Sequence, residues 1–394
     1  MAEEKDGTYK CSRAIEDVLT YGKALLKIIS PNDVGLTGGH QVGYYLPKPI
    51  WNLFTDFPPT KGQNNTTEVS VLWDDGSVTD SRVKWYGTGT RAEYRMTRFG
   101  KDFPYLTYDS VGDLLVLIPK SYTEFNCYVL DLEADIEEIQ AALGVRIQRS
   151  WAVFARDAPE PTEDECIDGY FHEFVKSLKQ FPMGKFFSKT AQEAILNCLK
   201  EINTYNSDKK LLEFVDAEYK LFRSAERILC LPEIVRPFKD VEDFLKTAKT
   251  ITQRRVSRAG RSLENHVEYI LKESGIPHQM RPNIDGEPDV VIPSEAAYND
   301  KTYPLSKLFI VGIKTTCKDR WRQVLDEGHR QPKKHLITLQ KGISGKQLQK
   351  MADAELTLVV PKDLHTLYPK KGKGHEATIL NVDSFIQSVK AALQ

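Results

Sequence analysis

The pattern of hydrophobic and polar positions changes near residue 160. Before that point, short runs rich in β-branched and aromatic residues alternate with turn signals. Asp74-Asp75-Gly76 separates two such runs, which is typical of a β-hairpin because these residue types accept a positive φ. The pattern predicts strands at 68–73, 78–86, 114–119 and 125–130 and helices at 12–29 and 136–143. Residues 1–157 are therefore predicted to form a compact β-rich domain.

The rest of the chain is first helical and then alternates between helices and strands. Residues 158–168 contain prolines and clustered acidic residues, which favours an exposed linker. Residues 169–250 show mostly helical spacing. Beyond them the pattern predicts helices at 261–274, 319–328, 347–354 and 382–393 and strands at 289–292, 308–314, 336–339 and 356–360. Such alternation predicts an α/β layer around a central sheet within residues 169–394.

The composition is that of an ordinary globular protein and limits the classes of partner. Of 394 residues, 41% are hydrophobic and 28% are charged, which argues against wholesale disorder or a fibrous repeat. Lys and Arg total 54 against 55 for Asp and Glu, so bulk charge does not favour a protein that coats nucleic acid or anionic membrane. Any such partner has to be met by local patches.

Neither a membrane nor a secretory route is indicated. No run of about 20 apolar residues is present, and the first residues are acidic rather than a cationic head followed by an apolar run. The six cysteines are scattered without a Cys-x-x-Cys pair, so neither a zinc site nor a disulfide framework is expected. We therefore expect a cytoplasmic protein with reduced thiols.

The residues most informative about chemistry lie at the ends of two predicted strands. Asp289 follows Pro288 at the start of one strand, and Lys314 ends another strand 25 residues later. At neighbouring strand ends the two side chains would converge on one edge of the sheet. Phosphodiester hydrolysis needs an oxygen ligand for Mg²⁺ and a lysine that orients the attacking water. The pair alone is common by chance, and Asp289 capping a turn is the alternative reading.

Further carboxylates would complete such a metal pocket. A nuclease usually carries an acidic residue two positions before the lysine, but Gly312 occupies that position here. Glu327 follows Lys314 by 13 residues on the predicted helix 319–328, and Glu264 lies on the predicted helix 261–274. These carboxylates would restore the site. The alternative is that Glu327 is only solvated.

Lys318, Asp319 and Arg320 form a cationic-acidic-cationic group directly after the second of these strands. Lys and Arg can donate to the O6 and N7 atoms of guanine, and Asp can accept from the cytosine N4 amine. The group could therefore read G·C pairs in the major groove. A generic solvated charge run is the alternative.

A second basic stretch lies in the first domain. Residues 82–101 hold six basic residues against Glu93, and four aromatic residues are interleaved with them: Trp85, Tyr86, Tyr94 and Phe99. The basic side chains could contact phosphate while the aromatic faces pack on sugar or base. The alternative is an exposed hairpin loop with structural aromatics.

Three segments carry a resemblance to a known family. Residues 311–323 read Val-Gly-Ile-Lys-Thr-Thr-Cys-Lys-Asp-Arg-Trp-Arg-Gln and residues 257–264 read Ser-Arg-Ala-Gly-Arg-Ser-Leu-Glu. Both closely resemble the EcoRII family of type II restriction endonucleases. Residues 32–43, Asn-Asp-Val-Gly-Leu-Thr-Gly-Gly-His-Gln-Val-Gly, resemble the effector DNA-binding domain of the same family. The similarity in both halves covers nearly the whole chain.

For residues 169–394 the resemblance implies a catalytic domain of the restriction-endonuclease α/β type, the PD-(D/E)xK fold with a mixed central sheet. Its second acidic residue is displaced to a glutamate after the lysine. The resemblance assigns Asp289 and Glu327 to Mg²⁺ binding, Lys314 to orienting the attacking water and Glu264 to completing the acidic pocket.

The resemblance also implies a class of target. Lys318, Asp319 and Arg320 match the motif with which relatives read the outer CC and GG pairs. A CC…GG site such as CCWGG or CCNGG, cut to leave 5′-phosphate ends, follows. Gly89 and Tyr94 stand where the family's effector loop carries lysines, and Val215 stands where it carries an arginine near the central-base pocket. The central base pairs, and any extrusion of the central base, are therefore left open.

For residues 1–157 the resemblance implies a β-barrel-like effector domain. That domain would bind a second copy of the recognition sequence and relieve autoinhibition of a catalytic homodimer. Five residues match its DNA-contacting positions: His40, Tyr45, Arg91, Glu93 and Arg95. The implied partners are double-stranded DNA and a cognate cytosine DNA methyltransferase in a prokaryotic restriction-modification system.

Two other hypotheses compete with a Mg²⁺-dependent restriction endonuclease. One is a two-domain, sequence-specific DNA-binding regulator with an inactive nuclease fold, although all four residues of the expected active site are present. The other is a structure-specific repair nuclease, which would not need the group at 318–320. Cleavage at discrete plasmid sites, binding without cleavage, and cleavage of branched DNA would separate the three.

Overall fold

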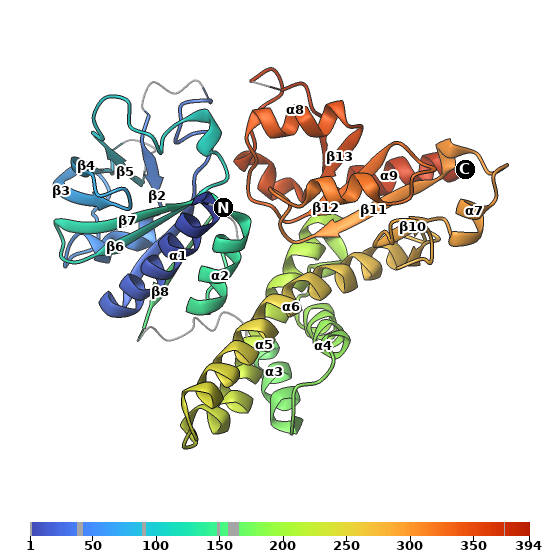
Figure 1. The fold of residues 1–394 in the computed structure, drawn as a ribbon, viewed down its shortest axis with the longest axis horizontal. Coiled ribbons are helices and arrows are strands. Elements are labelled where there is room, and N and C mark those ends of the chain that lie inside the picture. Colours follow the sequence, from blue (N-terminus) through green and yellow to red (C-terminus); the bar gives the residue numbers. More distant parts are fainter. Residues whose placement is uncertain (1, 38–41, 89–91, 148–149, 157–164, 374) are drawn as a thin grey trace. The chain divides into compact units, whose positions relative to one another are not determined.

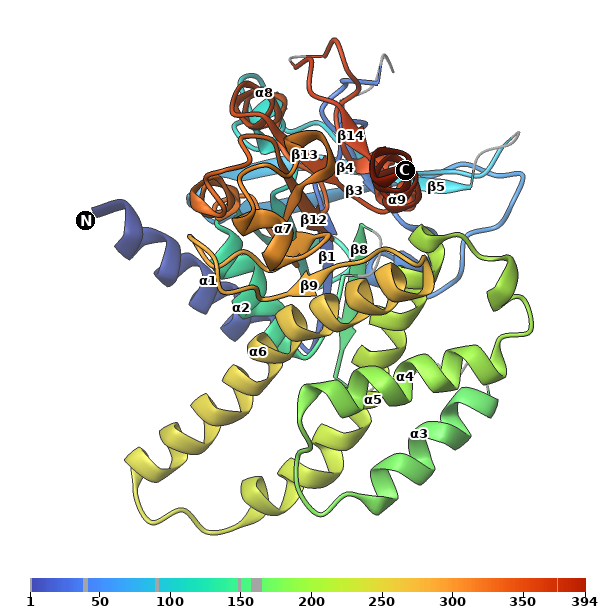
Figure 2. The same ribbon diagram turned by 90° about the vertical axis from the view of Figure 1, so that its right-hand side faces the viewer.

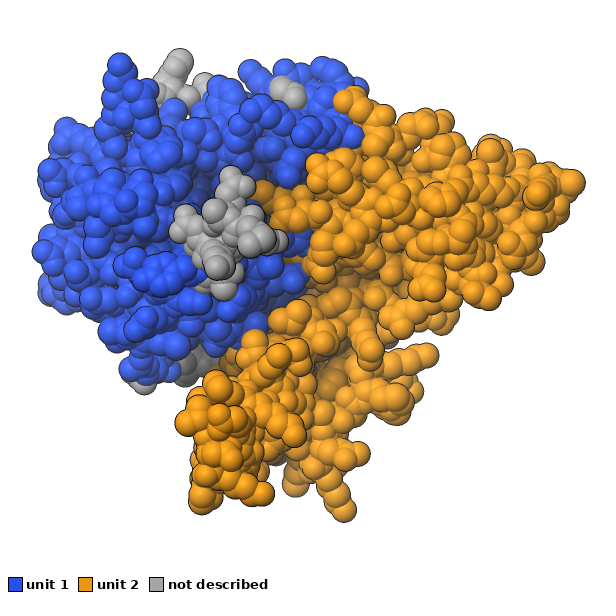
Figure 3. Space-filling model, in the orientation of Figure 1, with its two compact units in different colours: residues 1–158, 340–350, 364–376 blue, residues 159–339, 351–363, 377–394 orange. Residues whose placement is uncertain are grey.

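The computed structural model describes residues 2–37, 42–88, 92–147, 150–156, 165–373 and 375–394. The chain forms two compact units (Figure 3). Unit 1 comprises residues 1–158, 340–350 and 364–376, and unit 2 comprises residues 159–339, 351–363 and 377–394. Two segments from the last third of the chain thus belong to the same unit as the N-terminal part.

Unit 1 is built on an eight-stranded sheet of order β2-β5-β4-β3-β7-β6-β1-β8 (Figure 1). All neighbouring strands in it are antiparallel except β3 and β7, which are parallel. Its elements before residue 157 are α1 (Ala2–Tyr21), β1 (Lys23–Ile28), β2 (Tyr44–Leu46), η1 (Lys48–Leu53), β3 (Asn65–Trp73), β4 (Val78–Tyr86), β5 (Glu93–Thr97), η2 (Tyr108–Ser110), β6 (Leu114–Pro119), β7 (Glu124–Leu130), α2 (Glu133–Leu143) and β8 (Trp151–Ala155). The expected β-rich N-terminal part is confirmed.

Both faces of this sheet carry a hydrophobic core. On one face α1 and α2 pack against β1, β6 and β7. On the other face an aromatic core gathers around Trp73, which contacts the rings of Phe99, Phe103 and Tyr105 at centroid distances of 4.6–5.9 Å. Because β1 and β6 are covered on both sides, neither shows an alternating pattern: β6 is a continuous apolar run, and β1 is apolar except at Lys23 and Lys27.

That double burial explains an error in the sequence-based prediction. Residues 12–29 were expected to form one helix, but α1 ends at Tyr21 and β1 begins at Lys23. Gly22 separates them in a left-handed conformation at φ +73°, with its N–H bonded to Val18 O at 2.9 Å. A fully buried strand cannot be distinguished from a buried helix by periodicity alone.

The predicted hairpin is confirmed. β3 and β4 pair antiparallel with Leu72 opposite Val78. Gly76 takes a φ of +82° and its N–H bonds to Trp73 O at 3.0 Å. The hairpin register places Val83 and Trp85 in the aromatic core and leaves the alternate positions of β4 on the other face of the strand.

Unit 2 combines a helical layer with a six-stranded mixed sheet of order β14-β13-β12-β11-β10-β9. Strands β9, β10 and β11 are antiparallel neighbours, whereas β11 to β14 run parallel. The elements from residue 165 onward are α3 (Glu165–Ser177), α4 (Gly184–Cys198), η3 (Ile202–Thr204), α5 (Ser207–Val235), α6 (Val241–Glu273), β9 (Gln279–Met280), β10 (Val290–Ile292), α7 (Glu295–Asn299), η4 (Leu305–Lys307), β11 (Phe309–Lys314), η5 (Trp321–Asp326), β12 (Lys334–Thr338), α8 (Gly345–Asp353), β13 (Leu356–Val359), η6 (Lys362–Leu367), β14 (Ile379–Leu380) and α9 (Val382–Leu393). The expected mixed central sheet is confirmed.

The helix α6 connects the helical layer to the sheet. It has 33 residues, and its second half packs Leu263, Val267 and Ile270 into the core shared with β10 and β11. Figure 2 shows α6 running from the tip of the α5–α6 hairpin to β9. The predicted helix 261–274 is therefore the last part of a much longer element.

Two further predictions differ from the structure. Residues 319–328 do not form an α-helix: a turn is followed by the 3₁₀ helix η5, and Glu327 comes directly after it. Cys166 in α3 and Cys198 in α4 form a disulfide, although paired cysteines were not expected. The sequence separation of 32 gave no spacing signal for this pair. Among the described residues, no helix is both long and apolar enough to cross a membrane.

Candidate active site and DNA-contacting residues

Asp289 and Lys314 meet at one edge of the unit 2 sheet. Asp289 directly precedes β10 and Lys314 is the last residue of β11. The antiparallel register pairs Val290 with Val311, which places Asp289 beside Gly312. Asp289 Oδ2 accepts from Lys314 Nζ at 2.8 Å and from the N–H of Ile313 at 2.7 Å. The charge pair expected from the strand ends is therefore formed.

Glu327 completes this group from the segment after η5. Its Oε1 lies 3.9 Å from Lys314 Nζ, and its Oε2 is buried without a hydrogen-bond partner. A Cβ built on Gly312 would lie 3.5 Å from Glu327 Oε2 and 2.7 Å from Val324 Cγ2. Gly312 thus leaves the space that Glu327 and Val324 fill. The carboxylate missing at position 312 is supplied from another segment of the chain.

The loop before Asp289 holds Glu327 in place. Gly286 takes a φ of +72°, and a Cβ there would clash with Asp326 O at 2.1 Å, so only glycine allows this close approach. Asp285 accepts from the main-chain N–H of His329 at 2.6 Å, and its carbonyl accepts from Gly328 N at 2.8 Å. The positions on both sides of Glu327 are therefore tied to one loop.

The pKa of Glu327 is raised to about 7, chiefly by burial and also by the negative charge of Asp289. The positive charges of Lys314 and Lys334 act in the opposite direction. A carboxylate that is buried, lacks a hydrogen bond at one oxygen and faces a second carboxylate is stabilised in its charged form by an added cation.

Lys334 is a buried lysine that the sequence analysis did not single out. Only 3% of Lys334 is exposed. Its Nζ donates to Gly328 O at 2.6 Å and to Gln331 O at 2.5 Å, so it binds the main chain next to Glu327. Burial lowers the pKa of Lys334, while Asp285 and Glu327 oppose that change. The hydrophilic pair Lys333-Lys334 gave no sequence signal of burial.

Glu264 lies on α6, which buried polar contacts fix against α4 and α5. His266 Nε2 lies 2.9 Å from Glu218 Oε2, and Gln192 Nε2 lies 2.9 Å from His266 Nδ1. Asn265 donates to Ser188 Oγ at 2.8 Å. These contacts fix the residues next to Glu264 in the helical layer.

The carboxylate of Glu264 is paired with Arg281 rather than with the other acidic residues. Glu264 Oε2 accepts from Arg281 Nε at 3.1 Å and also from its Nη2. Arg281 follows β9, and its main-chain N–H donates to Asp289 O at 2.8 Å. The structure therefore brings Asp289, Lys314 and Glu327 together. Glu264 is not in contact with them and is linked to Asp289 through Arg281.

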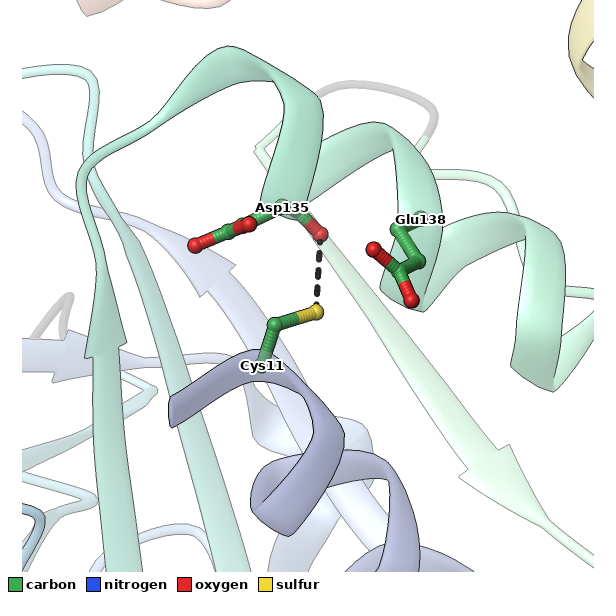
Figure 4. A group of neighbouring side chains, drawn as sticks. All are labelled: Cys11, Asp135 and Glu138. Atoms are coloured by element: carbon green, nitrogen blue, oxygen red, sulfur yellow. Dashed lines mark hydrogen bonds between the residues drawn. The ribbon is translucent and has the colours of Figure 1, made fainter. Parts of the chain in front are cut away.

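A second group of side chains that could hold a metal ion lies away from Asp289, Lys314 and Glu327. It is a cluster of one thiol and two carboxylates, among the described residues, whose ligand atoms lie within 4.8 Å of one another. Cys11, Asp135 and Glu138 form it in unit 1 (Figure 4). Cys11 Sγ donates to Asp135 O at 3.4 Å, and burial raises the pKa of this thiol to about 12. A protonated thiol that already donates a hydrogen bond is a poor metal ligand, so we assign no metal to this group.

The three residues expected to read bases lie in the turn between β11 and η5. Asp319 is exposed, Arg320 is half-buried and only 9% of Lys318 is exposed. Arg320 Nη2 donates to Thr316 Oγ1 at 2.8 Å. The turn follows directly on the strand that ends at Lys314.

Three of the five expected effector residues share one face of the unit 1 sheet. Tyr45 on β2 lies directly opposite Arg95 on β5, and Glu93 is two residues before Arg95. Burial raises the pKa of Tyr45, and Glu93 adds to this effect while Arg95 opposes it. His40 and Arg91 lie outside the described residues. The expected side chains that are described are thus neighbours.

The basic side chains of β4 extend this face. Lys84 lies opposite Arg95, and its Nζ is 4.8 Å from the centre of the Tyr86 ring. The expectation that Trp85 and Tyr94 contact DNA was wrong, because 1% and 5% of them are exposed and they pack into the aromatic core.

Comparisons with known proteins identify the class. A family model described as "Restriction endonuclease EcoRII, N-terminal" matches residues 17–154, and one described as "EcoRII C terminal" matches residues 222–386. The chain is a restriction endonuclease. It is 31% identical over 382 residues to the type II restriction enzyme EcoRII of Escherichia coli, covering 92% of each chain. The chain therefore belongs to the EcoRII family of type II restriction endonucleases, and the resemblance seen in its sequence is confirmed.

Solved structures also match part of the chain. A structure of metal-depleted Ecl18kI in complex with uncleaved, modified DNA is 19% identical, covers 57% of this chain and 83% of its own, and has a TM-score of 0.44. A complex of the restriction endonuclease PspGI with substrate DNA is 14% identical, covers 54% of this chain and 93% of its own, and has a TM-score of 0.45.

Proposed function

We propose that this restriction endonuclease hydrolyses phosphodiester bonds of double-stranded DNA in a Mg²⁺-dependent reaction, at a CC…GG-containing site of the CCWGG or CCNGG type. The observation that carries the proposal is the position of Lys314, whose Nζ lies 2.8 Å from Asp289 Oδ2 and 3.9 Å from Glu327 Oε1. A lysine between two carboxylates at a sheet edge supplies the groups that phosphodiester hydrolysis needs.

The residues present fit a divalent cation of the hard, oxygen-binding type. Glu327 Oε2 is buried and has no hydrogen-bond partner, and Asp289 lies beside the same lysine. Mg²⁺ is typically bound by one or two carboxylates together with waters and phosphate oxygens. Asp289 and Glu327 would hold the ion. When bound, it would polarise the phosphate and offset the charge that develops on it.

The remaining chemistry belongs to side chains of this chain. Lys314 orients the attacking water through its ammonium group, and its hydrogen bond to Asp289 Oδ2 fixes its direction. The water oxygen bonds to phosphorus, the bond from phosphorus to O3′ breaks, and the products are a 3′-hydroxyl and a 5′-phosphate. Glu264 is assigned to the acidic pocket, which it reaches when its pairing with Arg281 opens.

Recognition is assigned to the turn after β11. Lys318, Asp319 and Arg320 would contact the outer C·G pairs, with the cations donating to guanine and the carboxylate accepting from cytosine. The turn begins four residues after Lys314. Base reading and cleavage chemistry are therefore placed on one continuous segment.

Residues 1–157 are assigned to an effector domain, 158–168 to a linker and 169–394 to the catalytic domain. His40, Tyr45, Arg91, Glu93 and Arg95 would bind a second recognition site, which activates a catalytic homodimer. Tyr45 lies opposite Arg95 with Glu93 two residues away, so the described members of this set are neighbours, which supports a common binding surface. A cognate cytosine methyltransferase would protect the host DNA.

Cleavage mapping on plasmids tests the proposal. Purified protein with Mg²⁺ is expected to cut a sequenced plasmid at discrete CC…GG loci, with termini that carry 5′-phosphate. Asp289→Ala is expected to bind the same DNA without cutting it. Random degradation, or cutting by the Asp289→Ala variant at the normal rate, would overturn the assignment.

The same experiment addresses the alternative of a regulator with an inactive nuclease fold. That alternative requires the unaltered protein to bind CC…GG sites tightly without cutting them in Mg²⁺. The paired geometry of Lys314, Asp289 and Glu327 favours the enzyme, because a nuclease fold that has lost its activity has no need to keep these three groups in contact.

A further inference from the structure

Arg281 occupies an unusual position next to the candidate active site. It follows β9 and lies opposite Asp289, with its N–H bonded to Asp289 O at 2.8 Å. Its φ is +47°, a left-handed conformation that side chains other than Gly, Asn and Asp rarely adopt. Such a conformation persists only where the surrounding structure holds it, so the fold fixes the main chain from which the Arg281 side chain projects.

The ion pair between Arg281 and Glu264 is largely open to solvent on the arginine side. The Arg281 side chain is 61% exposed, and its ion pair is with Glu264 Oε2. Exposed ion pairs of this kind contribute little, because water and salt screen them. A guanidinium binds phosphate through two parallel hydrogen bonds, which is a stronger and more specific arrangement than an exposed pair with a carboxylate.

Charge at this edge of the sheet also favours an exchange of partners. Asp289, Glu327 and Glu264 supply three carboxylates, and Lys314 is already engaged with the first two. A DNA phosphate brought to this edge adds negative charge beside them. Arg281, which follows β9 and lies beside Asp289, is an exposed cation whose release from Glu264 would offset that charge.

We propose that Arg281 is a substrate-binding residue: in DNA-free protein it pairs with Glu264, and on DNA binding its guanidinium moves to a backbone phosphate at the cleavage site. The exchange frees the Glu264 carboxylate for the acidic pocket beside Asp289 and Glu327. The inference rests on the proposed function, since it requires DNA to lie along this edge of the sheet.

DNA binding without metal tests the exchange separately from cleavage. Affinity for a duplex carrying a CC…GG site is measured in EDTA over a range of salt concentrations. Arg281→Gln is expected to bind about tenfold more weakly and to lower the slope of log K against log salt by about one unit, as loss of a single phosphate contact does. Arg281→Lys is expected to show the normal salt dependence but only part of the normal affinity. A lysine keeps the positive charge but lacks the paired donors of the guanidinium group.

Two further variants define what contradicts the proposal. Lys272→Gln removes an exposed cation, 62% exposed and paired with Glu268, from the same helix that carries Glu264. It changes the net charge equally and is expected to leave the slope unchanged. Equal effects of Arg281→Gln and Lys272→Gln would overturn the proposal. Glu264→Gln frees Arg281 and is expected to bind as tightly as the unaltered protein or more tightly, whereas weaker binding would also overturn it.

The outcome is distinguishable from failure of the proposed function. Asp289→Ala leaves Arg281 in place and is expected to bind DNA in EDTA with the full salt slope. If that variant cuts DNA, the active-site assignment fails whatever Arg281 does. If it binds without cutting and Arg281→Gln keeps the full slope, only the role of Arg281 fails.

Discussion

Gly312 leaves room for two side chains that come from the segment after its strand. Val324 is fully buried, and its Cγ2 would lie 2.7 Å from a Cβ at position 312. Gly312→Ala is therefore expected to lower the free energy of unfolding by about 1–3 kcal/mol, the usual cost of overpacking. Because Val324 lies three residues before Glu327, the shift of Val324 is also expected to displace Glu327 and so to slow DNA cleavage. Urea unfolding and plasmid cleavage measure the two effects.

A double variant checks the physical reason. Val324→Ala removes the atoms that collide with the new methyl group. The cost of Gly312→Ala combined with Val324→Ala should then be smaller than the sum of the two single costs, because residues in contact are not additive. Strict additivity would mean that the two side chains do not compete for one space.

His335 on β12 makes the stability of unit 2 depend on pH. Burial lowers the pKa of His335 to about 4, and its Nδ1 is buried without a hydrogen-bond partner. The unfolded chain, with a histidine pKa near 6.5, binds the proton more readily than the folded chain. The stability that comes from keeping His335 neutral is therefore complete above about pH 6.5. It is lost as the pH falls toward 4, and the loss in the free energy of unfolding reaches about 3 kcal/mol.

Replacing the ring isolates this contribution. His335 packs against Phe309 and Phe385 at centroid distances of 5.6 and 5.2 Å, so His335→Phe keeps a ring in the same apolar surroundings. Urea unfolding between pH 7 and pH 4.5 should show a shallower loss of stability for the variant than for the unaltered protein. Parallel curves would contradict the assignment to His335.

The sequence identified part of the candidate site and missed the rest for a physical reason. Asp289 and Lys314 stand at strand ends, where local patterning places them. Glu327 was singled out by its position 13 residues after Lys314, and the family resemblance assigned its role. Arg281 and Lys334 act through main-chain carbonyls, a main-chain N–H and a carboxylate on another element. Such partners depend on the tertiary fold and leave no periodic signal in the sequence.

At the scale of elements, a strand with one buried face was predicted with its bounds, whereas burial on both faces left the assignment ambiguous: it was right for β6 and wrong for β1. β4 alternates along its length, and its bounds match the prediction at 78–86. β1 is buried on both faces and was taken for helix. Residues 319–328 form a turn and a 3₁₀ helix because Gly286 and Asp285 hold the following main chain close to their own loop.

The loop between η5 and β12 depends on a buried cation. Lys334 Nζ donates to Gly328 O and Gln331 O, at 2.6 and 2.5 Å. Lys334→Met keeps the apolar stem but leaves these carbonyls without that donor, at a cost of about 1–3 kcal/mol for each unsatisfied group. Because Gly328 adjoins Glu327, the variant is expected to cut DNA at least tenfold more slowly while its DNA affinity in EDTA is unchanged.

Lys333→Met is the matched control, since Lys333 is the exposed neighbour in the same segment. It should leave stability and cleavage rate close to normal. Raising the Mg²⁺ concentration should recover part of the activity of Lys334→Met if the loss comes from displacement of Glu327. Equal behaviour of the two variants would show that the buried amine does not position the carboxylate.

On the scale of the whole molecule, a net charge of −1 conceals local fields of opposite sign. In unit 1, β4 and β5 carry Arg82, Lys84 and Arg95; Lys84 lies directly opposite Arg95, which is 8% exposed, and Arg82 pairs with Glu68. Asp289, Glu327 and Glu264 gather near one edge of the unit 2 sheet. A net charge near zero argues against a protein that coats nucleic acid through bulk charge. It is compatible with two local sites that bind different groups.

If the face of unit 1 binds a second recognition site, cleavage depends on the number of sites supplied. A plasmid with two CC…GG sites is expected to be cut at least several-fold faster than a plasmid with one, and a short duplex carrying the site should stimulate cutting of the one-site plasmid. Lys84→Gln removes a positive charge from this face of unit 1, so the variant should require a higher concentration of the duplex for the same stimulation. Lys120→Gln removes an exposed cation at the end of β6 and should not. Equal rates on the two plasmids would contradict the effector role, while cleavage itself would still support the active site in unit 2.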